Sequence, residues 1–223
     1  MSAVLVISGL AAEARIAGGA GVVTVAAPPA ALSDKLTTVE RDGIGAIVSF
    51  GLAGGLAPAL AAGDLLIADA VAAGTVVHPC DTASVARLTL RMAGHGMALR
   101  RGRLAATDTP VMSPKAKAAL AASADAVAVD TESQHAAALA ARWGVPLVVL
   151  RAIADPADAA LPPLAVRAIG PDGRLDFRAI AGELVRRPGQ IGALPATGRQ
   201  SARAFGTLRR VRAVLGPGLG LLL

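Results

Sequence analysis

The sequence has very few of the residues that cross-link small secreted proteins or bind structural metals. It contains a single cysteine, Cys80, so no disulfide can form within the chain, which suits a reducing compartment such as the cytoplasm. A lone cysteine, with no CxxC motif and no cluster of histidines, also argues against a structural zinc site. We expect Cys80 to be inert, because reactive cysteines need surroundings that lower the pKa of the thiol.

Aromatic residues are also scarce. They make up 2% of the 223 residues, with no Tyr, whereas hydrophobic residues make up 54%. The core must therefore consist mainly of Ala, Val and Leu, and a chain of this length suits one large domain. The net charge of +6 originates in residues 160–223, which hold ten Arg and three acidic residues. Because few aromatic side chains are present to stack on bases, nucleic acid is a poor match for this charge.

Basic residues are missing before the first apolar run, "MSAVLVISGL", so this run predicts a buried strand rather than a signal peptide. The uncharged stretch 43–63 is long enough to span a membrane. However, its six glycines and Pro58 favour a strand, a glycine-rich turn and a short helix.

Apolar runs bounded by Gly, Ser or Asp alternate with helical patterns. Strands are predicted at 3–8, 44–51, 102–111, 126–130 and 145–155 and within 17–27 and 64–77, and helices at 33–43, 113–124 and 131–144. Ser33 and Ser113 are the predicted helix caps, and Gly43 and Gly144 the predicted helix ends. Residues 83–99 fit neither pattern. The alternation predicts an α/β fold of three layers with a central mixed β-sheet.

The end of the chain differs from the rest. Residues 1–185 form the predicted α/β domain, and 186–223 are a Pro- and Gly-containing linker followed by a basic amphipathic helix. The apolar stripe of this helix consists of Phe205, Leu208, Val211 and Leu215. Two interpretations are open: the helix lies on an anionic membrane surface, or it packs on the domain or on a partner subunit.

Four apolar strands end in polar residues, in the segments "SFG", "ATD", "VDTE" and "IAD". In open α/β sheets ligands bind beyond the carboxyl ends of the strands, so these residues are candidates for one shared pocket. Each carboxylate also has a purely structural explanation. Asp155 precedes Pro156 as a helix cap does, whereas Asp130 and Glu132 lie where the helix dipole favours negative charge.

Three segments resemble signatures of the purine nucleoside phosphorylase and nucleosidase superfamily: "VISGLAAEARIA", "SFGLAGGLAPALAAGDLLIADAV" and "AVAVDTESQHAAALAARWGVPLVVLRAIADPAD". Their order and spacing are similar to the family's over residues 3 to about 158. The "GLAAEAR" start, "SFGLAGGL" and the basic C-terminal extension resemble the hopanoid-associated phosphorylases in particular.

The resemblance implies an enzyme that cleaves the N-glycosidic bond of an adenosyl compound, with release of adenine from adenosylhopane by phosphorolysis or hydrolysis. It implies a homodimer with no cofactor or metal, and inorganic phosphate is a candidate co-substrate. A lipid-linked substrate would bring this cytoplasmic protein to the inner face of the membrane, with the C-terminal tail as the candidate contact.

The resemblance also implies roles for the carboxylates. Asp155 matches the aspartate that protonates the purine at N7, which requires a raised pKa such as an apolar strand end provides. Arg151, on the same strand, would oppose that pKa shift if it faced the same side. Glu132 matches the glutamate that accepts hydrogen bonds from the ribose hydroxyls, and Thr131 stands where nucleosidases place a Met against the sugar.

Further positions concern the nucleophile. Glu13 lies near the glutamate that orients water in some nucleosidases, although an ungapped comparison aligns Ala14 with that residue. Gly9 and Arg15 are candidates for binding phosphate.

Two segments depart from the family pattern. In "SFGLAGG", Ser49 and Leu52 stand where phosphorylases place Arg and Ser around phosphate, which puts phosphorolysis in doubt, and the backbone of Gly51 remains as a donor.

In "TDTPVM", Pro110 stands where nucleosidases stack Phe on the purine. Val111 offers backbone N–H and C=O groups to the adenine edge, and Asp108 is a candidate for the base amine. The apolar rim suits a large lipid substituent at the sugar 5′ position.

Two alternatives stay open. A 5′-methylthioadenosine/S-adenosylhomocysteine nucleosidase would use the same carboxylates, but the missing aromatic shelf and Leu52 argue against it. A non-catalytic nucleoside- or lipid-binding protein would use the same fold, but the presence of both Glu132 and Asp155 argues against a loss of catalysis.

Overall fold

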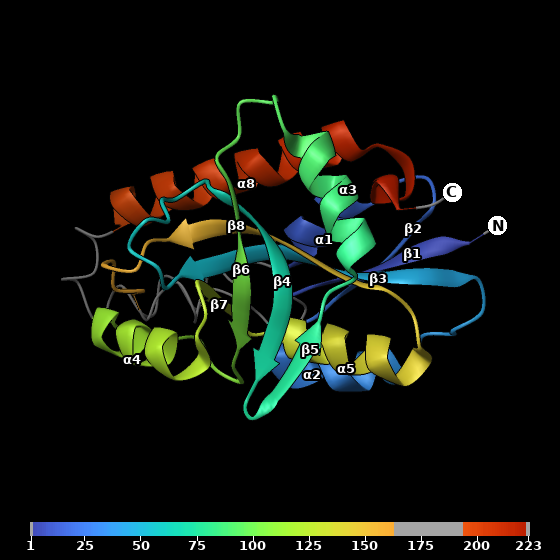
Figure 1. Cartoon of the computed structure of the whole chain (residues 1–223), viewed down its shortest axis with the longest axis horizontal. Helices are drawn as coiled ribbons and strands as arrows, with labels where there is room; N and C mark the ends of the chain where they lie inside the picture. The colour runs from blue at the N-terminus through green and yellow to red at the C-terminus, as the bar shows by residue number, and fades with distance from the viewer. Residues whose placement is uncertain (1, 163–193, 222–223) are drawn as a thin grey trace.

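The computed structural model describes residues 2–162 and 194–221, whose eight strands form one mixed sheet (Figure 1). The strands are β1 (Ala3–Ser8), β2 (Val22–Ala26), β3 (Ile44–Gly55), β4 (Leu65–Ala73), β5 (Val76–Pro79), β6 (Leu99–Ala106), β7 (Ala128–Asp130) and β8 (Leu147–Asp155). β1 is parallel to β2 and β3, whereas β7 is antiparallel to β3 and parallel to β6. The expected mixed sheet is confirmed. The domain boundary expected at residue 185 lies outside the described residues.

β8 closes part of the sheet into a ring. It pairs in parallel with β3 on one side and antiparallel with β4 on the other. β3 also pairs with β7, β7 with β6 and β6 with β4, so five strands form a closed, barrel-like ring. All but one residue of β8 is buried, which is why its sequence is mostly apolar and does not alternate, with Arg151 and Asp155 as its two charged residues.

Helices lie on both sides of the sheet. They are α1 (Ala11–Ala17), α2 (Pro29–Thr37), α3 (Thr82–Met92), α4 (Pro114–Ala124), α5 (Ser133–Trp143), α8 (Leu194–Leu215) and a final 3₁₀ turn (Pro217–Gly220). In the view of Figure 1, α2, α4 and α5 lie below the sheet, and α1, α3 and α8 lie above it. This arrangement gives the three layers predicted from the sequence. Residues 83–99, which fitted neither pattern, contain most of α3.

Two of the predicted helix boundaries are confirmed. Ser113 caps α4, since its Oγ accepts a hydrogen bond from the Ala116 N–H at 3.2 Å. Gly144 ends α5 with φ at 65°, a left-handed conformation that favours glycine.

Other expectations are wrong. α2 begins at Pro29, because proline fits the first helical turn, where its missing N–H is not needed, so Ser33 lies inside the helix. The helix ends at Thr37 rather than at Gly43. The short helix expected after the glycine-rich segment is absent from residues 56–63, which form turns, and β3 continues through that segment as a strand.

The core consists of the small and aliphatic side chains that the composition requires, and its one buried aromatic residue among those described is Phe50. Cys80 is buried as well, and this burial raises the pKa of its thiol to about 12. The expectation of an inert cysteine is therefore confirmed, because the thiolate is the reactive form.

The C-terminal helix packs on the domain. Ala204, Leu208, Val211 and Leu215 of α8 are buried, chiefly against β8. Thr207 Oγ1 also donates a hydrogen bond to the Gly63 carbonyl at 2.6 Å. Of the two interpretations of this helix, packing on the domain is therefore the one observed, and most of the apolar stripe is not available to a membrane. Among the described residues no helix is both long and apolar enough to cross a membrane.

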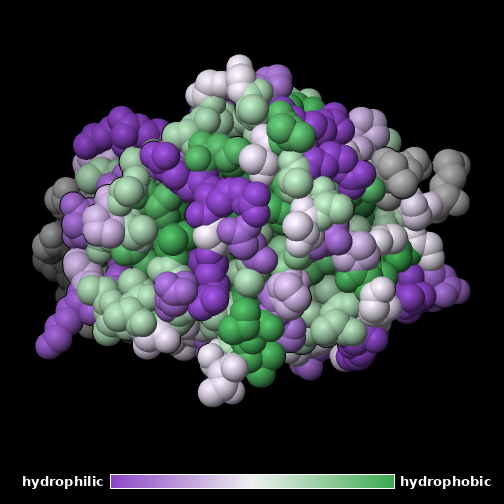
Figure 2. All heavy atoms as spheres, in the orientation of Figure 1, coloured by the Kyte–Doolittle hydropathy of each residue, from purple (hydrophilic) through white to green (hydrophobic). Residues whose placement is uncertain are grey.

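The face drawn in Figure 2 carries a hydrophilic band over β4 and β6, where Arg101 pairs with Asp69 and Arg100 lies 3.4 Å from Asp64. Below this band an apolar cluster lies over β5. There Val76 and Val77 are about half exposed, at 53% and 49%.

Candidate active site

A charged cluster lies inside the sheet, around a fully buried arginine. Arg151 of β8 places Nη2 2.5 Å from Asp130 Oδ2, at the end of β7, and Nη1 3.3 Å from Glu132 Oε2, at the start of α5. Nη2 also donates to Ser49 Oγ at 2.6 Å, and Nη1 donates to the Leu52 carbonyl at 3.2 Å. A guanidinium removed from water needs such partners, so the folding of β8 requires the carboxylates.

Asp130 connects Arg151 to the first turn of α5. Its Oδ1 accepts from the Ser133 N–H at 3.1 Å, and its Oδ2 accepts from Ser133 Oγ at 2.5 Å. Ser133 Oγ also lies 2.9 Å from Ser49 Oγ. Asp130 therefore both stabilises the helix start and orients its neighbours. Ser49, which stands at one of the positions where phosphorylases bind phosphate, has a fully buried hydroxyl that is bonded to Arg151 and Ser133 in this structure, and its contact with substrate stays a prediction.

Glu13, on α1, reaches the same cluster. Its side chain is buried, and its two carboxylate oxygens accept from the backbone N–H groups of Leu10 and Leu52, both at 2.8 Å. Burial, followed by the nearby charge of Glu132, raises the pKa of Glu13 to about 7, although Arg151 and the two N–H groups act in the opposite direction. The cluster therefore contains a carboxyl group that can take up or release a proton near neutral pH.

Glu132 lies beside Glu13 with a raised pKa of its own. Burial is the main cause, and the charge of Asp130 adds to it, whereas Arg151 lowers the pKa. Thr131 Oγ1 donates to Glu132 Oε1 at 2.6 Å. Thr131 thus acts on Glu132 in this structure, in addition to any contact with a sugar.

Two glycines make room for these carboxylates. A Cβ atom on Gly9 would lie 2.5 Å from Glu132 Oε1, and a Cβ atom on Gly51 would lie 2.6 Å from both Glu13 Oε1 and Arg151 Nη1. Both separations are far shorter than a van der Waals contact, so no larger residue fits without displacement. Gly9 therefore adjoins a carboxylate, whereas Gly51 adjoins both a carboxylate and the guanidinium of Arg151, and the phosphate contacts expected of the two glycines stay predictions.

Asp155, at the end of β8, is held by a lysine. Lys117 of α4 is fully buried, and its Nζ lies 2.5 Å from Asp155 Oδ2. Burial raises the pKa of Asp155, while the hydrogen bond and the charge of Lys117 lower it. Arg151, which was expected to oppose this shift if it faced the same side, contacts the Glu13 and Glu132 cluster instead.

The charged cluster and Asp155 adjoin the same strand. Gly51 contacts the cluster and Gly54 contacts Asp155, and the two glycines are three steps apart along the strand, or roughly 10 Å. The pairing of β3 with β8 is irregular here: Ala53 pairs with Ile153 and Gly54 with Asp155, which leaves Ala154 unpaired. Such a bulge redirects a side chain at the edge of a site.

Other predicted residues lie outside this arrangement. Arg15 is exposed on α1, two residues from the buried Glu13, and a two-residue step leads to nearly the opposite side of a helix. Asp108 is exposed and accepts a hydrogen bond from Gln134 Nε2 at 2.8 Å. Val111 packs beside a small apolar cluster that includes Val129. The structure therefore does not bring Arg15 or Asp108 to the carboxylates.

Sequence reasoning missed Lys117 and Ser133. Lys117 lies on the Ala-rich helix α4, and the structure shows that it is the buried residue of this helix. Burial on a helix with little apolar periodicity could not be foreseen. Ser133 follows Glu132 directly and resembled an ordinary residue of a first helical turn.

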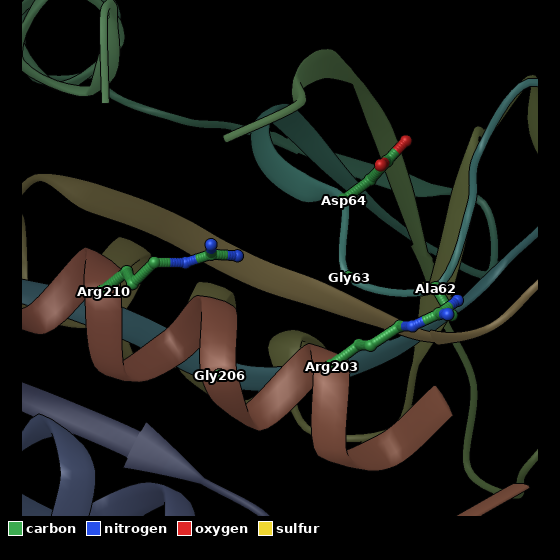
Figure 3. A pocket seen from close by; sticks show the side chains of 6 residues that line it. All are labelled: Ala62, Gly63, Asp64, Arg203, Gly206 and Arg210. Atoms are coloured by element: carbon green, nitrogen blue, oxygen red, sulfur yellow. The ribbon is translucent and has the colours of Figure 1, made fainter. Parts of the chain in front are cut away.

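A separate surface cavity of about 440 Å³ lies between α8 and the turn that precedes β4 (Figure 3). Arg203 and Arg210 line it from α8, on either side of Gly206, and Asp64 lines it from the opposite wall. Seven residues separate the two arginines, so both project from one face of the helix. None of the charged residues of the buried cluster lines this cavity.

The charged cluster and Asp155 lie on segments that are characteristic of one enzyme family. The profile of the phosphorylase superfamily matches residues 3–186. The chain belongs to the phosphorylase superfamily. It is accordingly an enzyme of the nucleoside phosphorylase and nucleosidase type, as the three sequence segments predicted.

Solved structures share the fold at low identity. The 5′-methylthioadenosine/S-adenosylhomocysteine nucleosidase of Helicobacter pylori, in complex with butyl-thio-DADMe-Immucillin-A, is 16% identical, with a TM-score of 0.69 over 96% of this chain and 97% of that one. Native futalosine hydrolase of Helicobacter pylori is 16% identical, with a TM-score of 0.64 over 94% and 96%. A putative 5′-methylthioadenosine/S-adenosylhomocysteine nucleosidase of Francisella philomiragia is 17% identical, with a TM-score of 0.62 over 95% and 100%. No curated protein sequence matches the chain.

Proposed function

We propose that this enzyme cleaves the N-glycosidic bond of an adenosyl compound with water as the nucleophile. The observation that carries this proposal is the charge of the buried cluster. Three carboxyl groups, those of Glu13, Asp130 and Glu132, surround the single guanidinium of Arg151. The cluster is therefore short of positive charge whenever more than one carboxyl group is ionised.

Phosphate fits this cluster poorly. A phosphate ion bound near Gly9 and Gly51 would face Glu13 and Glu132 at short range, where like charges repel strongly. Arg151 offers little compensation, because its charge is already shared among the carboxylates. Water is neutral, and a carboxyl group with a pKa near 7 is suited to take a proton from it. The named structural relatives are a nucleosidase and a hydrolase, which is consistent with water as the nucleophile.

Glu13, Glu132 and Asp155 each have one task in this reaction. Glu13 accepts a proton as water attacks the anomeric carbon, and Glu132 accepts hydrogen bonds from the ribose hydroxyls. The negative charge nearby stabilises the positive charge that develops on the sugar as the bond to the base lengthens. Asp155 gives its proton to the purine, so that the base leaves as a neutral molecule.

Adenosylhopane is the substrate that we favour. This choice is supported by the "GLAAEAR" and "SFGLAGGL" segments and by Pro110, which leaves an apolar rim without an aromatic shelf. The second candidate is 5′-methylthioadenosine or S-adenosylhomocysteine, on which the structural relative from Helicobacter pylori acts by its name.

Contact with an anionic membrane surface would bring the enzyme to a lipid-linked substrate. The contact lies on the outer face of α8, which exposes Arg199, Arg203, Arg209 and Arg210 and carries no acidic residue. Each such residue contributes about 1 kcal/mol near an anionic surface. The test is sedimentation with vesicles of phosphatidylglycerol or of phosphatidylcholine. Replacement of Arg203, Arg209 and Arg210 by Gln should abolish binding to the anionic vesicles, and unchanged binding would rule this surface out.

A homodimer is the expected assembly. The resemblance to the family supports it, as does the exposed apolar pair Val76 and Val77 on the edge strand β5 (Figure 2). Light scattering measures the mass directly, and a Val76→Lys variant shows whether this edge takes part.

The decisive experiment incubates the protein with adenosylhopane in detergent, with and without phosphate, and separately with 5′-methylthioadenosine. Adenine together with a free ribosyl product, whether or not phosphate is present, is the expected result. A sugar 1-phosphate that forms only with phosphate would refute the hydrolytic reaction. Adenine release from 5′-methylthioadenosine alone would move the substrate to the second candidate.

A further inference from the structure

Lys117 is the one buried residue of α4, and all of its hydrogen bonds go to one short segment. Its Nζ lies 2.5 Å from Asp155 Oδ2, 2.7 Å from the Pro156 carbonyl and 2.9 Å from the Ala159 carbonyl. An ammonium group has three N–H donors, so these three acceptors satisfy it completely. Lys117 therefore ties α4 to the turn that follows β8.

The packing of α4 does not account for a charged residue at this position. The other contacts of the helix with the core are made by Leu120, Ala121 and Ala124, which are only partly buried. A methionine at position 117 would fill a similar volume without the cost of removing an ammonium group from water. The charge itself must therefore serve Asp155 and the turn.

The pair leaves half of the Asp155 carboxyl group free. Lys117 occupies Oδ2, and within the described residues Oδ1 accepts no hydrogen bond. Gly54 lets the carboxyl group lie against β3, since a Cβ atom there would be 3.2 Å from Oδ2. Among the residues that the structure describes, Lys117 is the one charged side chain that shifts the pKa of Asp155, and the adjacent Gly54 and Gly55 are neutral.

We propose that Lys117 is a positioning residue for the departure of the base. It fixes Asp155 Oδ2, so that Oδ1 presents its proton to the purine, and it balances the negative charge that Asp155 acquires when the proton leaves. In this step the O–H bond of Asp155 breaks, an N–H bond forms on the purine, and the electron pair of the glycosidic bond passes to the base. Lys117 keeps its own protons throughout. The inference rests on the proposed function of Asp155.

The cation has a consequence for the pH dependence. It makes Asp155 a stronger acid, which favours the transfer, but it also lowers the pH at which the carboxyl group loses its proton. Removal of the cation should therefore slow the reaction and move its decline on the basic side to higher pH. If Lys117 served only the stability of the fold, its replacement would not change the pH at which activity declines on the basic side.

The test compares Lys117→Met and Lys117→Gln with Lys115→Met, an exposed neighbour on the same helix. We expect kcat for adenine release to fall about 10- to 100-fold in both Lys117 variants, with KM little changed and the basic limb about one pH unit higher. Lys115→Met should behave as the parent enzyme. The Gln variant can still bond the Pro156 carbonyl, so it carries the test if the Met variant does not fold. A basic limb that stays in place in the folded variant would overturn the proposal.

A double variant separates the two roles of Lys117. In an Asp155→Asn background, Lys117→Gln should change kcat by less than about twofold, because its effect passes through the carboxyl group. A further loss as large as in the parent background would overturn the proposal.

One measurement does not depend on the substrate. The carbon-13 resonance of the Asp155 carboxyl group, identified by its loss in Asp155→Asn, should titrate at higher pH in Lys117→Gln than in the parent protein. An unchanged titration would overturn the proposal even if the enzyme were active. If the parent protein released no adenine at all, the proposed function would fail, while this titration would still test the contact.

Discussion

Strand β8 carries two buried ion-pair groups with different charge balances. Near its middle, Arg151 faces the carboxyl groups of Glu13, Asp130 and Glu132. At its end, Asp155 faces Lys117, the one charged partner it has within residues 2–162 and 194–221. The first group has more acids than bases, so it holds a proton near neutral pH, as the pKa of about 7 for Glu13 indicates. The second group is balanced. The local surroundings, rather than the type of residue, thus distinguish a carboxyl group whose pKa is raised to about 7 by burial and a neighbouring acid from one whose pKa, raised by burial, is held back by a lysine.

The largest effect on the rate is expected at the pair of Asp155 and Lys117. We expect Asp155→Asn to lower kcat for adenine release by about 10³-fold, because the amide cannot transfer a proton to the base. Asp158→Asn, an exposed position three residues further on, is the matched control. If Asp155→Asn retained more than a tenth of the parent rate, Asp155 would not be the proton donor.

The cluster around Arg151 has more acids than bases, so removal of Arg151 should lower the stability of the fold. Arg151→Met should lower the free energy of unfolding by about 3–5 kcal/mol at pH 7.5, because buried carboxylates lose their partner. Arg142→Met on the exposed surface of α5 should change it by less than about 0.5 kcal/mol. Urea unfolding measures both, and a loss below about 1 kcal/mol for Arg151→Met would mean that the carboxyl groups do not depend on Arg151.

The same group should control the acidic side of the activity profile. In the parent enzyme we expect kcat/KM to rise through pH about 7 as Glu13 becomes able to accept a proton. Glu13→Gln should lower kcat by about 100-fold and remove this rise. A rise that persisted in Glu13→Gln would assign it to another group, with Glu132 as the first candidate.

The proton on Glu13 also affects stability. The folded state raises its pKa from 4.5 to about 7, so between these values the folded protein holds a proton that the unfolded chain releases. The free energy of unfolding should therefore fall as the pH rises from about 4.5 through about 7, by up to about 3 kcal/mol from this residue. Thermal unfolding across this range measures the effect, and Glu13→Gln should show a smaller fall. An equal fall in the variant would attribute it to other groups.

The smallest effect concerns a single hydroxyl group. Thr131→Val keeps the shape of the side chain but removes the hydrogen bond to Glu132 Oε1. A net hydrogen bond contributes about 1 kcal/mol, so kcat/KM should fall about fivefold. An unchanged kcat/KM would mean that Arg151 alone is sufficient to orient Glu132.

Local signals in the sequence predicted much of the fold. Apolar runs predicted the strands, and Ser113 and Gly144 marked helix boundaries, because capping depends on a few adjacent residues. The start of α2 was wrong because two possible start signals, Pro29 and Ser33, lie within one helical turn of each other. The ring closed by β8 was not predicted, because the sequence of a strand does not by itself determine which strands it pairs with.

The carboxylates of the candidate site were predicted from the sequence, but the cations that pair with them were not. Glu13 and Glu132 are brought together with Arg151, although their roles in catalysis remain predictions. Lys117 could not be paired with Asp155 from the sequence, because 38 residues separate them and only the tertiary fold makes them neighbours. The backbone of Gly51 as a donor to phosphate stays a prediction; in the structure the space beside this glycine is taken up by Glu13 and Arg151.

The position of β8 between β3 and β4 has a consequence for local opening. Over its central residues β8 is hydrogen-bonded to a neighbouring strand on both sides, as an edge strand such as β5 is not. Its backbone amides should therefore exchange with solvent only when the whole domain unfolds. By contrast α4 has one buried residue, Lys117, and opening of the helix would break the three hydrogen bonds that Lys117 makes to the end of β8 and the turn that follows it. Such an opening would separate Lys117 from Asp155 while Arg151 stayed in place.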